Sequence, residues 1–458
     1  MNGILKVLID IASTPAILVA MIAVLGLILQ KKTIADIVKG GIKTFVGFLV
    51  VTAGANFVVS SLDPFGKMFQ QAFHVTGVVP NNEAIVAIAL EKFGTYTALI
   101  MLVGMAFNIL FARLTRFKYI YLTGHATLYM SCMIAVILQV AGLESVLLVL
   151  FGGIALGLAN TIFPAILQKY TRVITKNDKV ALGHTGNFGY AFAGVIGDMV
   201  KGDGKVKSTE EINFPKGLAF LRDSTVSITI TMTIAYVIVA VFAGSEFITK
   251  ELSGGTNYII YSVQQAGSFA AGVFIILAGV RLILAEIVPA FKGISEKLVP
   301  NAKPALDCPI VFPYAPNAVL IGFFSSFVGG IVSLLIMVVL KTPIIIPGVV
   351  PHFFCGATSA VYGNAKGGVR GAVLGSFLQG VLISFMPIFL MPVLGNLGFA
   401  GSTFSDTDYG VVGILLGSMA NGGKMFVMIG ILVAVVLLFI ASSILTAKEK
   451  ASSKGEVA

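Results

Sequence analysis

Long apolar runs, separated by short polar and lysine-rich stretches, form the main pattern of this chain. A helix that crosses a membrane needs about 20 mostly apolar residues, and ten runs reach or approach that length. They occupy residues 15–30, 44–62, 96–111, 119–142, 145–167, 225–244, 258–279, 318–340, 371–394 and 425–445. Three shorter apolar pieces, at residues 188–200, 343–361 and 410–420, are interrupted by glycine or proline. The pattern predicts membrane-spanning helices, with the short pieces as broken helices or hairpins around a transported substrate.

The composition favours the same class of protein. Hydrophobic residues make up 57% of the 458 positions and charged residues 11%, with a mean hydropathy of +0.97. Soluble domains contain about 25% charged residues. The 51 glycines fit close packing of helices in a membrane. We therefore predict an all-α polytopic membrane protein, and we interpret residues 15–30 as its first span because no small-residue cleavage site precedes Lys31.

Basic clusters orient the predicted spans, because cytoplasmic loops collect lysine and arginine. The clusters follow the first, third and fifth runs and consist of Lys31, Lys32, Lys39 and Lys43, then Arg113, Arg116 and Lys118, then Lys169, Arg172, Lys176 and Lys179. They predict an N-terminus outside the cell and a cytoplasmic tail at residues 448–458, so the number of crossings must be odd. We expect one integral membrane domain over residues 1–447, with a cytoplasmic loop at residues 198–223.

Several functional classes lack support in the sequence. The net charge of +10 is explained by cytoplasmic loops, and there is no nucleic-acid motif, dinucleotide fingerprint or metal-ligand spacing. The glycine-rich residues 363–368 lack the spacing of a phosphate-binding loop. The polar stretch at residues 198–223 is too short for an ATPase domain. The sequence therefore predicts a transporter without a cofactor, and not an enzyme.

Ionisable side chains within apolar runs are candidates for the transport site, because each costs about 2.5–3.5 kcal/mol to insert. His125 lies one helical turn before Tyr129, His184 lies in the glycine-punctuated residues 182–187, and Asp307 precedes Cys308 and Pro309. Each also has a structural interpretation: either histidine could cap a helix or bind a backbone carbonyl, and Asp307 could be an ordinary helix cap.

Asn82 and Glu83 are a further candidate pair for the transport site, and they fit equally well the start of a helix with an acid in its first turn. The remaining polar residues are expected to have structural roles. Arg281 and Glu286 are interpreted as an ion pair at the membrane boundary. Asp406 and Asp408 lie in a polar segment rich in serine and threonine, and we expect water to solvate both.

A set of short segments, in the same order along nearly the whole chain, resembles the ascorbate-type IIC permease of the bacterial phosphotransferase system, in the ascorbate–galactitol group. The segments are Lys39-Gly40-Gly41-Ile42-Lys43-Thr44 with Gly47-Phe48, residues 122–125, Gly183-His184, Gly279-Val280-Arg281 with Ala285-Glu286, Phe291-Lys292-Gly293-Ile294-Ser295, Ala315-Pro316-Asn317-Ala318-Val319, and Ile346-Pro347-Gly348 with Pro351-His352-Phe353-Phe354.

This resemblance implies a permease of the bacterial cell membrane with eleven spans and two re-entrant hairpins, usually a homodimer. A substrate-carrying core domain would move like an elevator against a V-shaped dimerisation domain. It would deliver the sugar to a cytoplasmic IIB protein, which phosphorylates it with phosphate relayed through IIA. The permease itself carries no phosphorylated residue and catalyses no reaction.

The resemblance also assigns substrate-binding residues, by position. They would be Asn82, Glu83, His125, Ala126, Thr127, Leu128, Tyr129, His184, Thr185 and Asp307, with Thr52-Ala53-Gly54 as a weaker addition. The family usually has a Thr-Tyr pair where this chain has Asn82 and Glu83, and glutamine in place of Tyr129 and Thr185.

Those departures leave alternatives to L-ascorbate open. Ascorbate is an anion, and an added carboxylate beside Asp307 disfavours it unless a charged histidine offsets the repulsion. A neutral polyol such as galactitol would accept carboxylates as hydrogen-bond partners. A proton- or sodium-coupled symporter that uses His125, His184 and Asp307 as a relay is a further alternative. The titratable groups and broken segments disfavour a passive channel.

Overall fold

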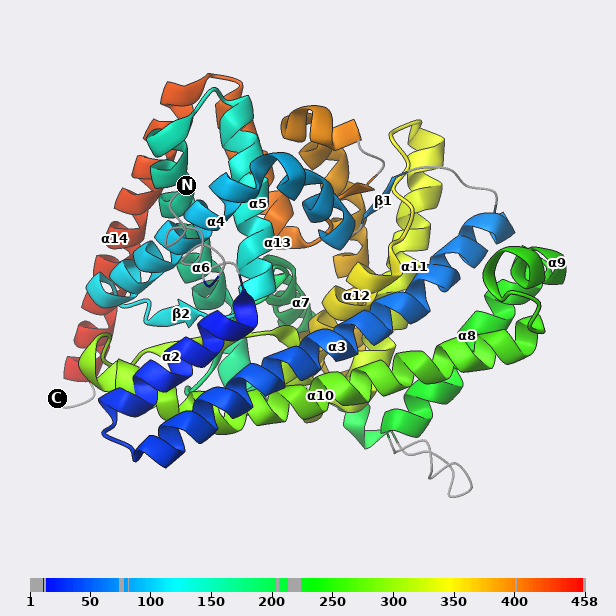
Figure 1. Ribbon diagram of the computed structural model, residues 1–458, viewed down its shortest axis with the longest axis horizontal. Coiled ribbons are helices and arrows are strands. Elements are labelled where there is room, and N and C mark those ends of the chain that lie inside the picture. The colour runs from blue at the N-terminus through cyan, green and yellow to red at the C-terminus, as the bar shows by residue number, and fades with distance from the viewer. Residues whose placement is uncertain are drawn as a thin grey trace.

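The computed structural model of the chain describes residue 11 and residues 14–73, 78–80, 82–202, 206–212, 224–399 and 402–455. The described chain is mostly helical (Figure 1). Its longer helices are α2 (Pro15–Leu29), α3 (Ile34–Phe73), α4 (Asn82–Leu114), α5 (Gly124–Val140), α6 (Ser145–Thr175), α7 (Asn187–Val200), α8 (Ser224–Ala243), α10 (Tyr258–Lys297), α11 (Pro316–Leu340), α12 (Val349–Leu390), α13 (Thr407–Ala420) and α14 (Lys424–Gly455). Shorter helical segments are η1 (Thr209–Glu211), α9 (Ser245–Phe247), η3 (Ile248–Leu252), η4 (Cys308–Tyr314) and η5 (Met391–Phe399).

The helices confirm the predicted apolar runs, since each run forms most of a helix or part of a longer one. The run at residues 119–142 differs at its start, because Tyr119–Tyr121 form strand β2 and α5 begins only at Gly124. Among the described residues, five helices are long and apolar enough to cross a bilayer, or six if the bent pair Met232–Ala243 and Ser245–Leu252 is one span. The chain is a multi-pass membrane protein, and the count of eleven spans stays a prediction.

Two of the three short apolar pieces are helical, as α7 and most of α13. The third, residues 343–361, is extended up to Gly348, with Ile345 in a bridge to Val78, and forms the start of α12 from Val349. Helix α12 is interrupted at Gly368, where the backbone angles are φ 56° and ψ −145°. The carbonyl oxygen of Lys207 accepts a hydrogen bond from Val369 N at this break, 2.9 Å away. A short apolar piece that contains glycine therefore marks a helix or half-helix in this fold.

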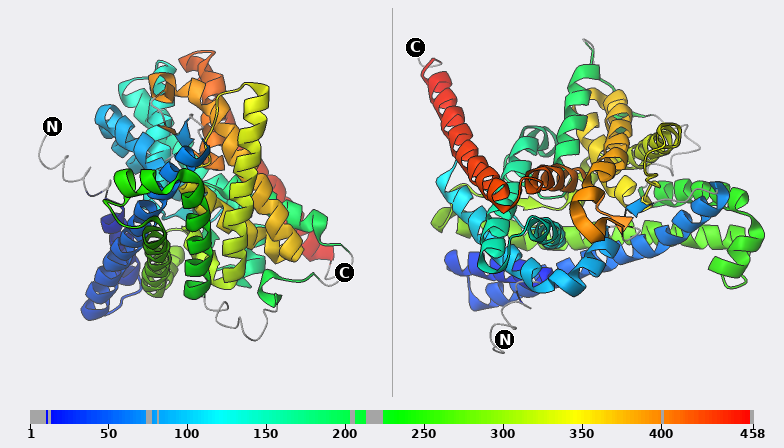
Figure 2. Two further views of the ribbon diagram at one scale, coloured as in Figure 1. Left: turned by 90° about the vertical axis from the view of Figure 1, so that its right-hand side faces the viewer. Right: turned by 90° about the horizontal axis from the view of Figure 1, so that it is seen from above.

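Helices α3 and α10, the longest pair that pack along each other, lie side by side with α2 and α8 in both views (Figures 1 and 2). One buried apolar cluster joins these four helices to α7, α11 and the first part of α12. A second cluster joins α4, α5 and the first part of α6 to α13 and α14.

Two small parallel sheets connect distant parts of the chain. In the first, β4 (Lys303–Leu306) lies between β2 and β3 (Ala181–Leu182), with Tyr121 opposite Ala305 and Leu182 opposite Leu306. In the second, β1 (Val79–Pro80) pairs with β5 (Ser402–Thr403), and Val78 forms a bridge with Ile345. Parallel strands are joined by long crossovers, so each sheet brings together segments that are far apart in sequence.

The first sheet is anchored at its base by Asp178, in the turn between α6 and β3 and outside the spans. Its carboxylate accepts hydrogen bonds from Lys303 Nζ at 2.5 Å, Gln168 Nε2 at 2.7 Å and Arg172 Nε at 2.9 Å. Burial by itself would raise the pKa of Asp178, but these donors outweigh burial and hold the pKa below its ordinary value of 3.8. Because Lys303 begins β4, its bond to Asp178 fixes the start of β4 to the turn that precedes β3.

We expect Asp178→Asn to lower the free energy of unfolding by about 1 kcal/mol or less at pH 7, since the carboxylate is 43% exposed and solvent screens its charge. A lowered folded-state pKa stabilises the protein above the unfolded-state pKa, and this stabilisation is lost as the pH falls through the folded-state pKa. Thermal unfolding of the purified protein should therefore separate wild type from variant at pH 7 and less so toward about pH 3. The control is Glu246→Gln, which breaks an exposed ion pair with Lys250 and should change little. A difference that is independent of pH would contradict the assignment.

Candidate functional site

The carboxyl ends of β2, β3 and β4 place three titratable side chains together. His125 lies just after β2, His184 just after β3, and Asp307 directly after β4. The parallel strands end at the same edge of the sheet, and Leu122 N and Gly183 N donate to the carbonyls of Ala305 and Leu306 there. His125 Nε2 lies 3.7 Å from Asp307 Oδ2, and His184 Nε2 lies 4.0 Å from Asp307 Oδ1.

Gly183 makes this arrangement sterically feasible. A Cβ atom at this position would lie 2.5 Å from the carbonyl oxygen of Ala305 in β4. A larger residue would push β3 away from β4, and with it His184 away from Asp307. The glycine beside the histidine is therefore needed for the strand pairing that forms the site.

The second sheet brings two more residues to the same place. Asn82 begins α4 just after β1, and Asp406 precedes α13 just after β5. Asn82 Nδ2 donates to Asp406 Oδ1 at 3.1 Å, and Thr185 Oγ1 donates to Asp406 Oδ2 at 2.5 Å. His184 Nε2 lies 3.9 Å from Asp406 Oδ2. We call Asn82, His125, His184, Thr185, Asp307 and Asp406 the candidate site.

The prediction that water solvates Asp406 and Asp408 is wrong. Asp406 is 4% exposed and Asp408 is 1% exposed. Asp406 accepts the hydrogen bonds just described, and Asp408 accepts from two backbone N–H groups at the start of α7. The segment is polar because its side chains bond to other helix ends, and not because it faces solvent.

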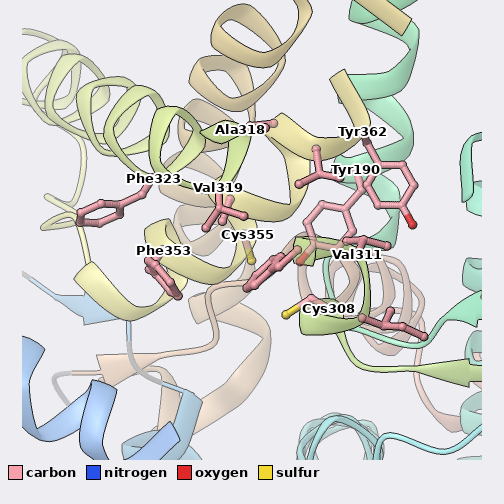
Figure 3. Close-up of a cluster of buried hydrophobic side chains, with 14 of the residues drawn as sticks. Tyr190, Cys308, Val311, Ala318, Val319, Phe323, Phe353, Cys355 and Tyr362 are labelled. Atoms are coloured by element: carbon pink, nitrogen blue, oxygen red, sulfur yellow. The ribbon is translucent and has the colours of Figure 1, made fainter. Parts of the chain in front are cut away.

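His184 is held by a buried aromatic ladder. Its Nδ1 atom shares a hydrogen bond of 2.6 Å with the hydroxyl of Tyr190, one of the buried side chains in Figure 3. The Tyr190 ring stacks on Tyr362, with ring centroids 6.0 Å apart and the rings 8° from parallel. Because Nδ1 is bonded to Tyr190, Nε2 is the atom that faces the two carboxylates. His184 is thus oriented by side chains and does not cap a helix.

Asp307 is both a helix cap and a neighbour of the two histidines, and His125 lies on the same helix face as Tyr129. Asp307 caps η4 by accepting from Cys308 N at 2.7 Å, and it also lies beside both histidines. The predicted shared face of His125 and Tyr129 is confirmed, with ring centroids 6.0 Å apart. The cap interpretation and the site interpretation of Asp307 are therefore compatible.

The structure places the other predicted residues as follows. Ala126 packs against the first sheet, Thr127 donates to Thr123 O within α5, and Leu128 is half-buried. The side chains of Glu83 and Thr52, and those of Arg281 and Glu286, lie outside the described residues, as do parts of the predicted loop and tail. The structure therefore brings together Asn82, His125, Tyr129, His184, Thr185 and Asp307, and it adds Asp406, which sequence analysis missed.

Histidine, cysteine and aspartate atoms come close enough here to raise the question of a metal. In the described chain the potential ligand atoms of His184, Cys355 and Asp406, and those of His184, Asp307 and Cys308, lie within 4.8 Å of one another. The oxygens of Asp406 already accept hydrogen bonds from Asn82, Thr185 and Ser405, and His184 Nδ1 is bonded to Tyr190. Because protein donors occupy both Asp406 oxygens and Tyr190 occupies His184 Nδ1, we assign no metal to the site.

Two buried polar atoms near the candidate site have no hydrogen-bond partner within the described protein. They are Thr123 Oγ1, just before α5, and Asn187 Oδ1, at the start of α7. Leaving such atoms unpaired costs about 1–3 kcal/mol each. A hydroxyl-rich ligand would pair with the carboxylates and imidazoles of the candidate site. The arrangement is suited to binding a small polyhydroxylated molecule.

Comparison with known proteins points to one family. The family described as PTS system sugar-specific permease component matches residues 10–408. The chain is also 26% identical over 436 residues to the ascorbate-specific PTS system EIIC component of Mycoplasma pneumoniae. That match covers 81% of this chain and 64% of the relative, so the chain spans just under two thirds of the relative's length.

Proposed function

The chain belongs to the family of sugar-specific permease components of the phosphotransferase system, and from this premise we propose that it carries a sugar-derived substrate, L-ascorbate first among the candidates, into the bacterial cell. A cytoplasmic IIB protein would phosphorylate the substrate with phosphate relayed by IIA. The chain would act as the transport subunit, without a cofactor and without catalysing the phosphoryl transfer.

The observation that carries this proposal is the meeting of His125, His184 and Asp307 at one sheet edge in a membrane protein. The two nitrogen–oxygen distances, 3.7 and 4.0 Å, leave the three groups close enough to bind one small molecule together. Ionisable groups at membrane depth are costly, and such groups typically mark a substrate path.

L-Ascorbate is the first candidate because the relative from Mycoplasma pneumoniae is ascorbate-specific by name. A protonated histidine beside Asp307 would offset the repulsion between an anionic substrate and the carboxylates. A neutral polyol such as galactitol is the second candidate. Asp406 places a second carboxylate, which is buried, beside His184. This favours a neutral polyol, because carboxylates accept hydrogen bonds from hydroxyl groups.

The proposed transport motion is an elevator-like displacement of a core domain against a V-shaped dimerisation domain in a homodimer. The long packed pair α3 and α10, with α2 and α8, is a candidate for the stationary part, and the helices that meet at the candidate site are candidates for the moving part. We keep as proposals the eleven spans with two re-entrant hairpins, the external N-terminus, the membrane domain at residues 1–447, and the cytoplasmic segments at residues 198–223 and 448–458.

Uptake of radiolabelled ascorbate into cells that express the chain, with and without matching IIA and IIB, tests this function. We expect labelled ascorbate to accumulate as its phosphate ester, and only when both partners are present. If ascorbate accumulates unmodified, and an uncoupler abolishes this accumulation, the chain is an ion-coupled symporter and the proposal is wrong. Phosphorylated galactitol in the same cells, without phosphorylated ascorbate, would keep the mechanism and change the substrate.

A further inference from the structure

Ser405 and Asp406, directly before α13, join the helix ends that form the candidate site. Asp406 bonds to Asn82 at the start of α4 and to Thr185 just before α7. Ser405 completes this link, because its backbone N and its hydroxyl both donate to Asn82 Oδ1, at 3.0 and 3.2 Å. The residues so joined are more than 200 positions apart in the sequence.

Asp408 holds the start of α7 by a second set of contacts. Its carboxylate accepts from Asn187 N at 3.1 Å and from Phe188 N at 2.8 Å, and its own N donates to Thr185 O at 2.8 Å. Thr407 Oγ1 accepts from Gly189 N at 3.1 Å. A carboxylate at a helix N-terminus is stabilising, because it pairs with free N–H groups and with the positive end of the helix dipole.

These contacts replace the cap that α7 lacks in its own sequence. The residue before α7 is Gly186, which has no side chain to cap the helix. Three successive backbone N–H groups, those of residues 187, 188 and 189, find their acceptors on α13 instead. The position of His184 and Thr185, directly before these residues, therefore depends on a helix that begins more than 200 residues later.

We propose that Asp408 is a positioning residue for substrate binding: it fixes the amino end of α7 and thereby holds His184 and Thr185 against Asp307 and Asp406. The proposal rests on the proposed function for its substrate, but the positioning itself concerns only this chain. Asp408 touches no predicted ligand atom, because both of its oxygens are occupied by backbone donors of α7.

The test compares Asp408→Asn and Thr407→Val with a matched control, Glu210→Gln. Glu210 also presents a carboxylate to a helix N-terminus, accepting from Asn317 N at 2.9 Å and Ala318 N at 3.3 Å at the start of α11. Asp408→Asn and Thr407→Val each remove one acceptor from the cap of α7, beside the candidate site. Glu210→Gln keeps Oε1, which accepts both bonds at the start of α11, and removes only the charge of that cap. The measurements are the KM and maximal rate of uptake of the substrate identified for wild type, the Tm of the purified protein, and hydrogen exchange of the peptide that covers residues 184–190.

For Asp408→Asn we expect KM to rise on the order of tenfold, because the variant loses one hydrogen bond to a charged group. The maximal rate should change little. Exchange should increase in residues 184–190, and Thr407→Val should show the same changes to a smaller extent. Glu210→Gln should lower Tm without raising KM. An unchanged KM together with unchanged exchange in Asp408→Asn would overturn the proposal, as would an equal rise in KM for the control.

The two proposals can fail separately. If wild-type protein takes up none of the tested sugars, the proposed function is wrong, and the exchange experiment still decides whether Asp408 holds α7. If wild type transports normally but residues 184–190 keep their protection in Asp408→Asn, the positioning role is wrong and the function stands. If Asp408→Asn does not fold, Thr407→Val gives the decision, because it removes one acceptor and keeps the shape of the side chain.

Discussion

Asp307→Asn is expected to weaken substrate binding about a hundredfold while the protein stays folded. Asparagine caps a helix as well as aspartate does, so the bond from Cys308 N to residue 307 should survive. The substitution removes the charge that faces His125 and His184 at 3.7 and 4.0 Å. The Asp307 side chain is 21% exposed and that of His184 is 9% exposed. Loss of one partner from such a mostly desolvated pair costs roughly 3 kcal/mol, which corresponds to that change in the dissociation constant. This variant therefore separates the two roles of Asp307.

Equilibrium binding of labelled substrate to purified wild type and variant, with Tm as the measure of folding, checks this expectation. His184→Ala is the companion variant and should weaken binding at least as much, since it removes the group between Asp307 and Asp406. Asp178→Asn is the control for a lost carboxylate outside the site. Normal binding by both Asp307→Asn and His184→Ala would show that the candidate site is not the substrate site.

Gly368→Ala is expected to destabilise the folded protein by at least about 3 kcal/mol, a large part of the total stability of a typical domain. The backbone angles at Gly368, φ 56° and ψ −145°, belong to a region that residues with a side chain rarely adopt. An added Cβ would also lie 2.1 Å from the carbonyl oxygen of Lys207, which is backbone and has to shift as a whole. The break in α12 therefore requires glycine for two independent reasons.

The yield of folded protein and its Tm after membrane extraction measure this effect. Gly267→Ala in α10 is the matched control, because a Cβ there meets nothing within 4 Å and the helix is regular. That control should be neutral or slightly stabilising, as expected for glycine to alanine within a helix. A Gly368→Ala protein with wild-type yield and Tm would mean that α12 can close its break, and that the loop at Lys207 does not depend on it.

Sequence reasoning predicted the helices well because the bilayer imposes a length and an apolar composition on each span. It also identified His125, His184 and Asp307, since an ionisable residue within an apolar run stands out by its cost. It missed Asp406 and Asp408 because their neighbours are serine and threonine, which look like a solvated loop. The signal available was their place just before the apolar residues 410–420, the same arrangement as Asp307 before its own apolar segment.

The strand pairing was not predictable from the chain alone. Residues 119–121, 181–182 and 303–306 are too short to show alternation, and their pairing joins segments more than 100 residues apart. Residues 119–121 even continue an apolar run, which is why the predicted span started too early. Register at this scale is decided by which partner strand is within reach in three dimensions, and a single sequence does not contain that information.

The order of strands in the first sheet also determines when the sheet can form during synthesis of the chain. Strands β2 and β3 do not pair with each other, and both wait for β4, which leaves the ribosome roughly 180 residues after Tyr121. At about 5–20 residues per second this delay is roughly 10–40 s, and Asp406 follows roughly 100 residues later still. During that time the nascent chain holds two histidines without their carboxylate. The candidate site is therefore complete only after the residues up to the start of α13 have been made, so its assembly is one of the late steps of synthesis.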